Sequence, residues 1–262
     1  MLRLRVITAV ALVGMVLFSI FALSAPALAV GFWLLAAIGG YEWAHLAGLR
    51  SRSQKMAFVA LFGLIAWLFY GRVDVYEDML RLGCGVWFFA AITVLMAPRG
   101  QRAFTSRGFM ILLGLSVLLP AWVALVVIRD QPQGQLWLLW CLCIAVAADV
   151  GAYFTGRRFD RHKLAPAVSP GKTWEGAVGG MAVAMLVCGL GAVALGERSL
   201  SWLLIIAALV VVSIFGDLFE SVMKRVAGVK DSGTILPGHG GVLDRIDSQL
   251  AILPVFALIL AS

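Results

Sequence analysis

One segment of this sequence combines acidic, hydroxyl and basic side chains at a helical spacing. Asp217, Glu220, Ser221 and Lys224 fall at positions i, i+3, i+4 and i+7, which places them on one face of a helix. Such a face can bind a cation and a phosphate, or its charges can neutralise one another as a ladder of salt bridges. Because it emerges from an apolar run, 201–216, we favour a functional role over an exposed ladder.

A second segment, KDSGTILPGHGGVLDRID at 230–247, carries two closely spaced carboxylates. Asp244 and Asp247 are three residues apart, so both can face the same way if DRID opens a helix. Close carboxylates repel one another, and oxygen ligands suit Mg²⁺, which commonly bridges to substrate phosphates. A proton path is the alternative for carboxylates alone. Basic neighbours favour a site for metal and phosphate, and these are Lys224, Arg225, Lys230 and Arg245.

Glycines in the same segment indicate backbone that approaches a ligand. Gly240 and Gly241 lack a Cβ, so they can turn N–H groups toward an anion. Gly233 and Pro237 keep the segment from being helical, and such backbone is tolerated near membrane depth only where protein or a water-filled cavity surrounds it. The neighbouring His239 could act as a general base, a phosphate donor or a structural hydrogen-bonding residue, and the sequence leaves these roles open.

Asp149 is an acidic residue at the end of an apolar run. An ionisable side chain there is costly, by about 2.5–3.5 kcal/mol at the centre of a spanning helix. On a helix, Arg157 lies two turns further along the same face. Asp149 therefore either has a functional role or only neutralises Arg157, and we favour function.

The segment SPGKT at 169–173 invites comparison with a phosphate-binding P-loop. That motif needs a glycine five residues before Gly171, where this chain has Pro166. We also expect no strand before it. The sequence therefore argues against a P-loop, although Lys172 remains a reasonable phosphate contact.

The composition predicts the kind of secondary structure that positions these residues. The chain has 262 residues, of which 62% are hydrophobic and 13% charged, whereas soluble domains are about half apolar and a quarter charged. We therefore predict an all-α, polytopic membrane protein that forms one integral membrane domain over 1–262, with N-terminal spans in 1–135 and catalytic spans and loops in 136–262. The nine predicted spans are 6–24, 27–47, 56–70, 79–97, 109–128, 136–155, 176–195, 201–220 and 248–261. The first could instead be a signal peptide; we favour an uncleaved span.

The basic residues predict an orientation. The net charge is +7, and with nine spans all but four of the 21 Lys and Arg residues fall on one side, the exceptions being Arg72, Arg81, Arg129 and Arg198. Because short cytoplasmic loops are rich in Lys and Arg, we predict a cytoplasmic N-terminus in the inner membrane. The site then opens to the cytoplasm through a polar cavity. Charge in short loops fits anionic headgroups rather than nucleic acid.

The residues from Ser221 to Asp247 resemble the signature of the phosphatidate cytidylyltransferase family. The fixed positions of that signature are matched by Ser221, Lys224, Arg225, Lys230, Asp231, His239, Gly240, Gly241, Asp244, Arg245 and Asp247. The earlier loop, with Asp149, GAYF, KLAP and SPGKTWEG, also looks like that family, as does the Glu42–Trp43 pair. The resemblance is close over 149–262 and rests mainly on hydropathy before that.

The resemblance implies an enzyme that makes CDP-diacylglycerol and pyrophosphate from CTP and phosphatidic acid with Mg²⁺, and it allows a K⁺ ion beside the metal and a homodimer. The implied metal-binding acids are Asp217 and Asp244, with Asp247 beside them. The expected catalytic residues are Lys224, Arg225, Lys230, Asp231, His239 and Arg245. The expected substrate-binding residues are Asp149, Ser169, Lys172, Thr173, Ser221, Gly240 and Gly241.

Two other functions fit the sequence less well. A transporter predicts inverted repeats and acids near mid-span, whereas the acids here concentrate in two loops. A CDP-alcohol phosphotransferase predicts spaced aspartates with DG and AR in one helix, and that pattern is absent. We therefore favour cytidylyl transfer.

Overall fold

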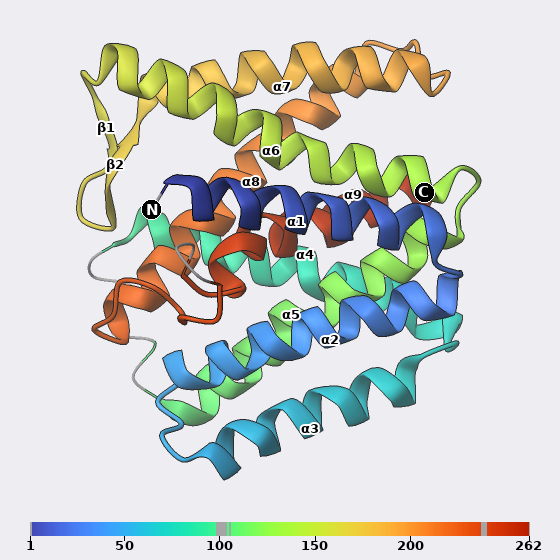
Figure 1. Ribbon diagram of the computed structural model, residues 1–262, viewed down its shortest axis with the longest axis vertical. Coiled ribbons are helices and arrows are strands. Elements are labelled where there is room, and N and C mark those ends of the chain that lie inside the picture. The colour runs from blue at the N-terminus through green and yellow to red at the C-terminus, as the bar shows by residue number, and fades with distance from the viewer. Residues whose placement is uncertain (1, 98–103, 105, 237–239, 262) are drawn as a thin grey trace.

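The structure is a computed structural model that describes residues 2–97, 104, 106–236 and 240–261. Within these residues the fold is nine α-helices and one β-hairpin (Figure 1). The elements are α1 (Leu2–Ala22), α2 (Ala25–Leu46), α3 (Arg52–Phe69), α4 (Val73–Leu95), α5 (Arg107–Asp130), α6 (Gly134–Phe159), β1 (Lys163–Ala165), β2 (Ser169–Thr173), α7 (Trp174–Ala194), α8 (Ser201–Val226) and α9 (Leu243–Ala261). The all-α class is confirmed.

The helix ends differ from the predicted spans because polar residues extend the helices beyond their apolar parts. The third span was predicted over 56–70, but α3 begins at Arg52. The Ser51 side chain accepts a hydrogen bond from Gln54 N–H, and the Gln54 side chain accepts one from Ser51 N–H. This reciprocal cap starts the helix about one turn earlier. The last helix likewise begins at Leu243 rather than at residue 248. The DRID segment, 244–247, therefore lies in its first turns, and Asp244 and Asp247 have the helical spacing assumed above.

The β-hairpin was not predicted. Strand β1 pairs antiparallel with β2, so the expectation that no strand precedes SPGKT is wrong. SPGKT is itself β2 rather than a phosphate-binding loop, and Thr173 caps α7 by accepting a hydrogen bond from Gly176 N–H at 3.0 Å. The short, polar, proline-containing segment gave no clear alternation from which strands could be predicted.

The helices run back and forth between two ends of the molecule. At the left of Figure 1, α2 ends where α3 begins, α6 ends at the hairpin that leads to α7, and α8 ends near the start of α9. At the other end Trp137 of α6 stacks on Trp202 of α8, with ring centroids 4.9 Å apart, and Phe256 of α9 lies beside them. The two polar segments predicted to carry chemistry therefore lie at the same end.

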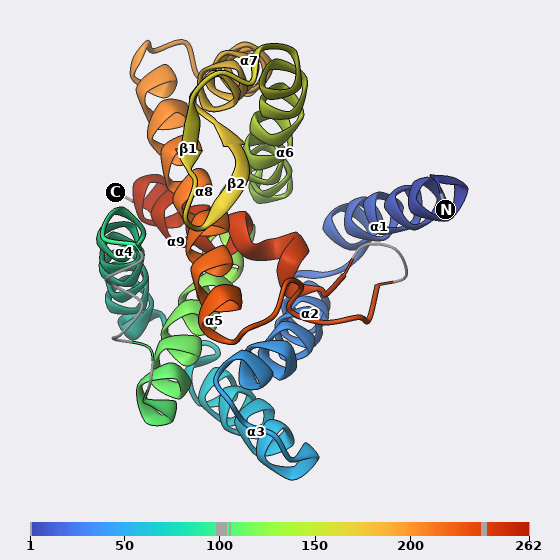
Figure 2. The same cartoon turned by 90° about the vertical axis from the view of Figure 1, so that its left-hand side faces the viewer.

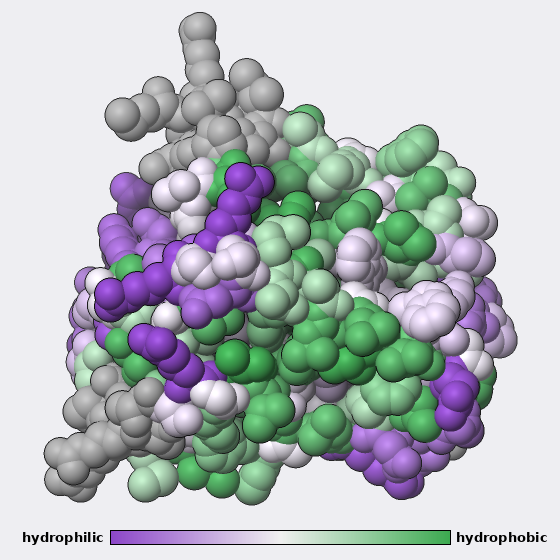
Figure 3. Space-filling model, turned by 90° about the horizontal axis from the view of Figure 1, so that it is seen from below, coloured by the Kyte–Doolittle hydropathy of each residue, from purple (hydrophilic) through white to green (hydrophobic). Residues whose placement is uncertain are grey.

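Seven helices of the described chain, α2 to α8, are long and apolar enough to cross a membrane. Figure 3 shows apolar residues across the middle of one face and hydrophilic residues gathered toward its two ends. Helix α5 lies largely inside the bundle, where Leu118, Ala124 and Ile128 are fully buried. These features make the chain a multi-pass membrane protein.

Glycines bring α6 and α7 unusually close together. A Cβ added to Gly180 would lie 2.5 Å from the carbonyl oxygen of Ala148, and one added to Gly151 would lie 2.8 Å from that of Gly179. Small residues allow such backbone contact in membrane helices. The close pair fixes both ends of the hairpin, which Figure 2 shows between the α6–α7 pair and α8.

Candidate active site

Lys224 joins carboxylates from two helices. Its ammonium lies 2.7 Å from Oδ1 of Asp244 in α9 and 3.1 Å from Oε2 of Glu220 in its own helix, α8. The pair to Glu220 is the i, i+4 contact of a salt-bridge ladder. The pair to Asp244 is not part of such a ladder, because it connects α8 to the first turn of a different helix, α9.

The second oxygen of Asp244 is held by the backbone. Oδ2 accepts hydrogen bonds from Ser232 N–H at 3.0 Å and Gly241 N–H at 2.8 Å. Burial alone would raise the pKa of Asp244, but the hydrogen bonds from Lys224, Gly241 and Ser232 outweigh burial and hold this pKa below its usual range. Asp244, which precedes the apolar part of α9, is therefore a fixed, ionised carboxylate.

Asp217 links α8 to the hairpin. Its Oδ2 lies 2.7 Å from the ammonium of Lys172 in β2, and its Oδ1 accepts a long hydrogen bond from Ser221 at 3.5 Å. Lys172 thus belongs to the same polar network as the α8 face, although 45 residues separate it from Asp217 in the sequence.

Asp247 connects two of the lysine-bound carboxylates, Asp217 and Glu220. It interacts electrostatically with Asp217 and with Glu220, and its Oδ1 accepts a hydrogen bond from Ser248 N–H at 2.6 Å. Oε1 of Glu220 is buried without a hydrogen-bond partner among the described residues. The network therefore runs from Lys172 through acids of α8 and α9 to Lys224.

The donor set of this network suits a hard cation. Carboxylate oxygens are the protein ligands that Mg²⁺ takes, and a cation would reduce the repulsion between the neighbouring carboxylates of Glu220 and Asp247. Within the described ranges no three acidic, histidine or cysteine side chains already surround a common point. The ammonium groups of Lys172 and Lys224 instead lie against the oxygens of Asp217 and Asp244.

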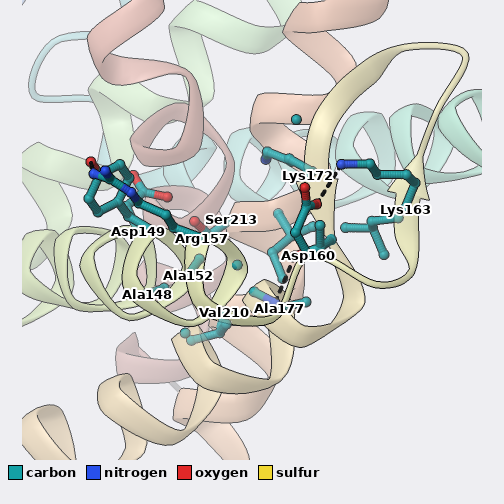
Figure 4. Close-up of a pocket in the computed structure, with 18 residues that line it drawn as sticks. Ala148, Asp149, Ala152, Arg157, Asp160, Lys163, Lys172, Ala177, Val210 and Ser213 are labelled. Atoms are coloured by element: carbon teal, nitrogen blue, oxygen red, sulfur yellow. Dashed lines mark hydrogen bonds and ion pairs between the residues drawn. The ribbon is translucent and has the colours of Figure 1, made fainter.

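A cavity of about 440 Å³ adjoins this network (Figure 4). Its walls are α6, α7 and α8, and the hairpin covers one side. Its lining combines charged residues from α6 and the hairpin with small and apolar residues. The charged residues are Asp149, Arg157, Asp160, Lys163 and Lys172; the apolar ones include Ala148, Ala152, Ala177, Val210 and Ile214.

Asp149 lines the cavity and belongs to the network. It interacts electrostatically with Lys172, Arg245 and Asp217. Arg157 instead donates a hydrogen bond to the hydroxyl of Tyr153 at 3.0 Å. The described contacts thus connect Asp149 to both polar segments and do not show it paired with Arg157.

Other predicted residues lie around this centre. Arg225 donates a hydrogen bond through Nε to the carbonyl of Val168 at the hairpin tip, at 3.4 Å. Lys230, Asp231 and Arg245 are exposed, whereas Ser169 is half-buried. The remaining prediction, His239, lies outside the described residues.

Two predicted substrate-binding residues already have partners within the protein. Thr173 is buried and its hydroxyl caps α7. The N–H of Gly241 was expected to face a bound anion, and in the structure the anion is the protein's own Asp244. Gly240 has a φ of 80°, which favours glycine because other residues are strained there.

Sequence reasoning missed one residue at this site. Glu42 of α2 is buried and accepts hydrogen bonds from Ser232, Val242 and Leu243. An acid inside an apolar helix was the available signal. Its partners lie about 200 positions away, so they could not be read from local spacing.

The chain is similar to proteins of one family over nearly its whole length. The sequence profile of the Cytidylyltransferase family matches residues 3–262. A phosphatidate cytidylyltransferase of Pseudomonas aeruginosa is 39% identical over 99% of this chain and 97% of its own. Proteins of the same name are 34% identical in Haemophilus influenzae, over 98% of both chains, and 30% identical in Staphylococcus haemolyticus, over 98% of this chain and 99% of the other.

Proposed function

The chain belongs to the cytidylyltransferase family, and on this premise we propose that it transfers a cytidylyl group from CTP to phosphatidic acid, giving CDP-diacylglycerol and pyrophosphate. The observation that carries the proposal is the row of carboxylates and lysines from β2, α8 and α9 at one end of an apolar helix bundle. A soluble triphosphate and a membrane lipid can both reach such a place.

The reaction joins two anions. A phosphate oxygen of phosphatidic acid attacks the α-phosphorus of CTP, a new P–O bond forms, and the bond to the β-phosphate breaks, so that pyrophosphate leaves with the negative charge. Repulsion between the substrates raises the barrier, and fixed positive charge with correct positioning lowers it. The attacking oxygen is already anionic, so no strong general base is needed and none is assigned to His239.

The lysines would contact the substrate phosphates and the acids would hold the metal ion. Lys172 and Lys224 are cations with mostly buried side chains, held in place by Asp217 and Asp244, so they can meet phosphate oxygens without large rearrangement. Asp217, Asp244 and Asp247 would hold Mg²⁺, with K⁺ as a second candidate ion beside it. When bound, the divalent ion supplies positive charge against the triphosphate.

The cavity suits the lipid acceptor. Ser213 lines it and lies 13 residues before the end of α8, which is roughly 20 Å along a helix. Apolar walls at that depth match acyl chains, while Lys163 and Lys172 lie where a phosphate would enter the network. CTP would approach from water beside Arg225 and Lys230, which are exposed.

We also propose that this end of the bundle faces the cytoplasm from the inner membrane. Most Lys and Arg residues of the described chain are in the segments that join helices at this end or in the helix turns next to those segments, as expected for the cytoplasmic side. CTP would then be available from the cytoplasm.

The test is a reaction with defined components. The chain is purified in detergent and supplied with CTP labelled on the α-phosphate, phosphatidic acid and Mg²⁺. We expect labelled CDP-diacylglycerol and one pyrophosphate per product. Diacylglycerol, which lacks the attacking phosphate, is the matched control and should give no product. Failure with phosphatidic acid while a different phosphorylated acceptor is cytidylylated would overturn the assigned substrate.

A further inference from the structure

Glu42 is a buried acid in the first half of the chain that contacts the far end of the sequence. The residue is 3% exposed and lies in α2, one of the helices long and apolar enough to span a membrane. A carboxylate there is expensive unless it is well hydrogen-bonded. We therefore expect hydrogen-bond donors around this carboxylate.

The partners are all in the segment that carries Asp244. Oε2 of Glu42 accepts from Leu243 N–H at 2.8 Å and from the Ser232 hydroxyl at 3.4 Å, and Oε1 accepts from Val242 N–H at 3.1 Å. The first N–H groups of a helix have no partner inside it. Glu42 thus caps the start of α9 with a side chain from another helix.

Glu42 and Asp244 share this backbone between them. Three consecutive amides serve the two acids: Gly241 N–H donates to Asp244, and those of Val242 and Leu243 donate to Glu42. Ser232 joins both, because its N–H donates to Asp244 while its hydroxyl donates to Glu42. Any shift of the segment away from Glu42 would therefore also move the donors that hold Asp244.

Two glycines make room for the carboxylate. A Cβ on Gly241 would lie 2.7 Å from Oε2 of Glu42, and one on Gly233 would lie 2.7 Å from its Cδ. Real Cβ atoms do not approach other atoms so closely. Gly233 and Gly241 thus pack so closely against the Glu42 carboxylate that neither position has room for a side chain.

We propose that Glu42 is a positioning residue for the cytidylyl-transfer site: it holds Ser232, Val242 and Leu243 in place, and through them the carboxylate of Asp244 opposite Lys224. Glu42 acts through Asp244 and touches no substrate. The part of this proposal that concerns turnover rests on the proposed function. The part that concerns the segment does not.

The test compares Glu42→Gln and Glu42→Ala with the wild type by two readouts. Hydrogen–deuterium exchange of peptides containing Val242 and Leu243 should be at least about 10-fold faster in Glu42→Ala, because their amides lose their acceptor. In turnover, kcat should fall about 10- to 100-fold, and the Mg²⁺ concentration for half-maximal rate should rise, as when a partner of a metal ligand is removed. KM for phosphatidic acid should stay unchanged. Glu42→Gln keeps one acceptor oxygen, so its exchange rate and its kcat should lie between those of the wild type and those of Glu42→Ala.

Trp43→Phe is the matched control. It removes the hydrogen bond from the indole N–H to the Met110 carbonyl, 2.8 Å long, so it disturbs α2 packing at the next residue without touching the segment. It should lower the melting temperature but leave local exchange and the Mg²⁺ dependence unchanged. Equal effects of Trp43→Phe and Glu42→Ala would reduce Glu42 to a packing residue and overturn the proposal, as would unchanged exchange in Glu42→Ala. An inactive wild type would refute the proposed function and the turnover role, while exchange would still decide whether Glu42 fixes the segment.

Discussion

The ammonium of Lys224 lies 2.7 Å from Oδ1 of Asp244, across the contact between α8 and α9 and 20 positions away in the sequence. Both side chains are largely buried, and the same ammonium also pairs with Glu220. One cation therefore compensates two acids, and the stability of this end of the bundle depends on it.

Replacement of Lys224 by Met should destabilise the protein. It would leave Glu220 and Asp244 buried without their cation, at a cost of about 3 kcal/mol. Thermal unfolding in detergent measures the effect as a melting temperature lowered by several degrees. Lys224→Arg keeps the charge and should lose much less. Equal melting temperatures for wild type and Lys224→Met would show that the pair does not stabilise the fold.

Asp217→Asn and Asp244→Asn should each lower kcat by about 100-fold or more, because a neutral amide no longer holds the positive charge that the reaction needs. Both variants should still insert into the membrane. CDP-diacylglycerol formation is the measurement, with Asp78→Asn as control, since Asp78 is exposed and pairs only loosely with Arg81 at 3.7 Å. Rates near the wild type in both site variants would refute the assignment of these acids to the metal.

Filling the cavity should affect the lipid substrate selectively. Ala177 lines the cavity, whereas its neighbour Val178 is 68% exposed and does not. We expect Ala177→Phe to raise KM for phosphatidic acid about 10-fold or more while KM for CTP stays the same. Val178→Phe should change neither. A selective rise in KM for CTP would instead assign the cavity to the nucleotide.

The close approach of α6 and α7 should not tolerate a side chain at Gly180. Leucine there would meet the Ala148 carbonyl and force the helices apart, at a cost of about 1–3 kcal/mol or more. The melting temperature of Gly180→Leu tests this. Gly85→Leu is the control, because nothing lies within 4 Å of a Cβ at Gly85. Similar melting temperatures for Gly180→Leu and Gly85→Leu would mean that α6 and α7 can move apart without loss of stability.

The orientation of the bundle can be tested with single cysteines in a variant that lacks the four native ones. The two substitutions are Arg198→Cys, just before the start of α8, and Lys230→Cys, just after its end. In intact spheroplasts, a maleimide that cannot cross the membrane should label the cysteine at 198 and label that at 230 only after lysis. The reverse pattern would invert the proposed topology.

Much of the fold was predictable because apolar runs of spanning length mark helices directly. The contacts that helical spacing implies were also predictable: Ser221 meets Asp217 and Lys224 meets Glu220, each four residues apart. Helix ends were less accurate, since a cap such as Ser51 lies outside the apolar run that locates the helix.

Contacts between distant segments could not be predicted from spacing. Lys172 was expected to bind phosphate, but nothing in SPGKT shows that a hairpin brings it to Asp217. Gly241 was expected to approach an anion, and it does, but local sequence cannot tell a substrate from Asp244. The hydrogen bonds of Glu42 could not be predicted either, because their donors are 190 to 201 positions away in the sequence.

The contact between Glu42 and the start of α9 also constrains biogenesis. Glu42 enters the bilayer with one of the first helices, yet its hydrogen-bond donors are synthesised some 200 residues later. Until then the nascent chain carries an unsatisfied acid in α2, which is tolerable only if it is protonated or reached by water. Truncated chains that end before residue 232 should therefore be prone to degradation even when all their helices have inserted.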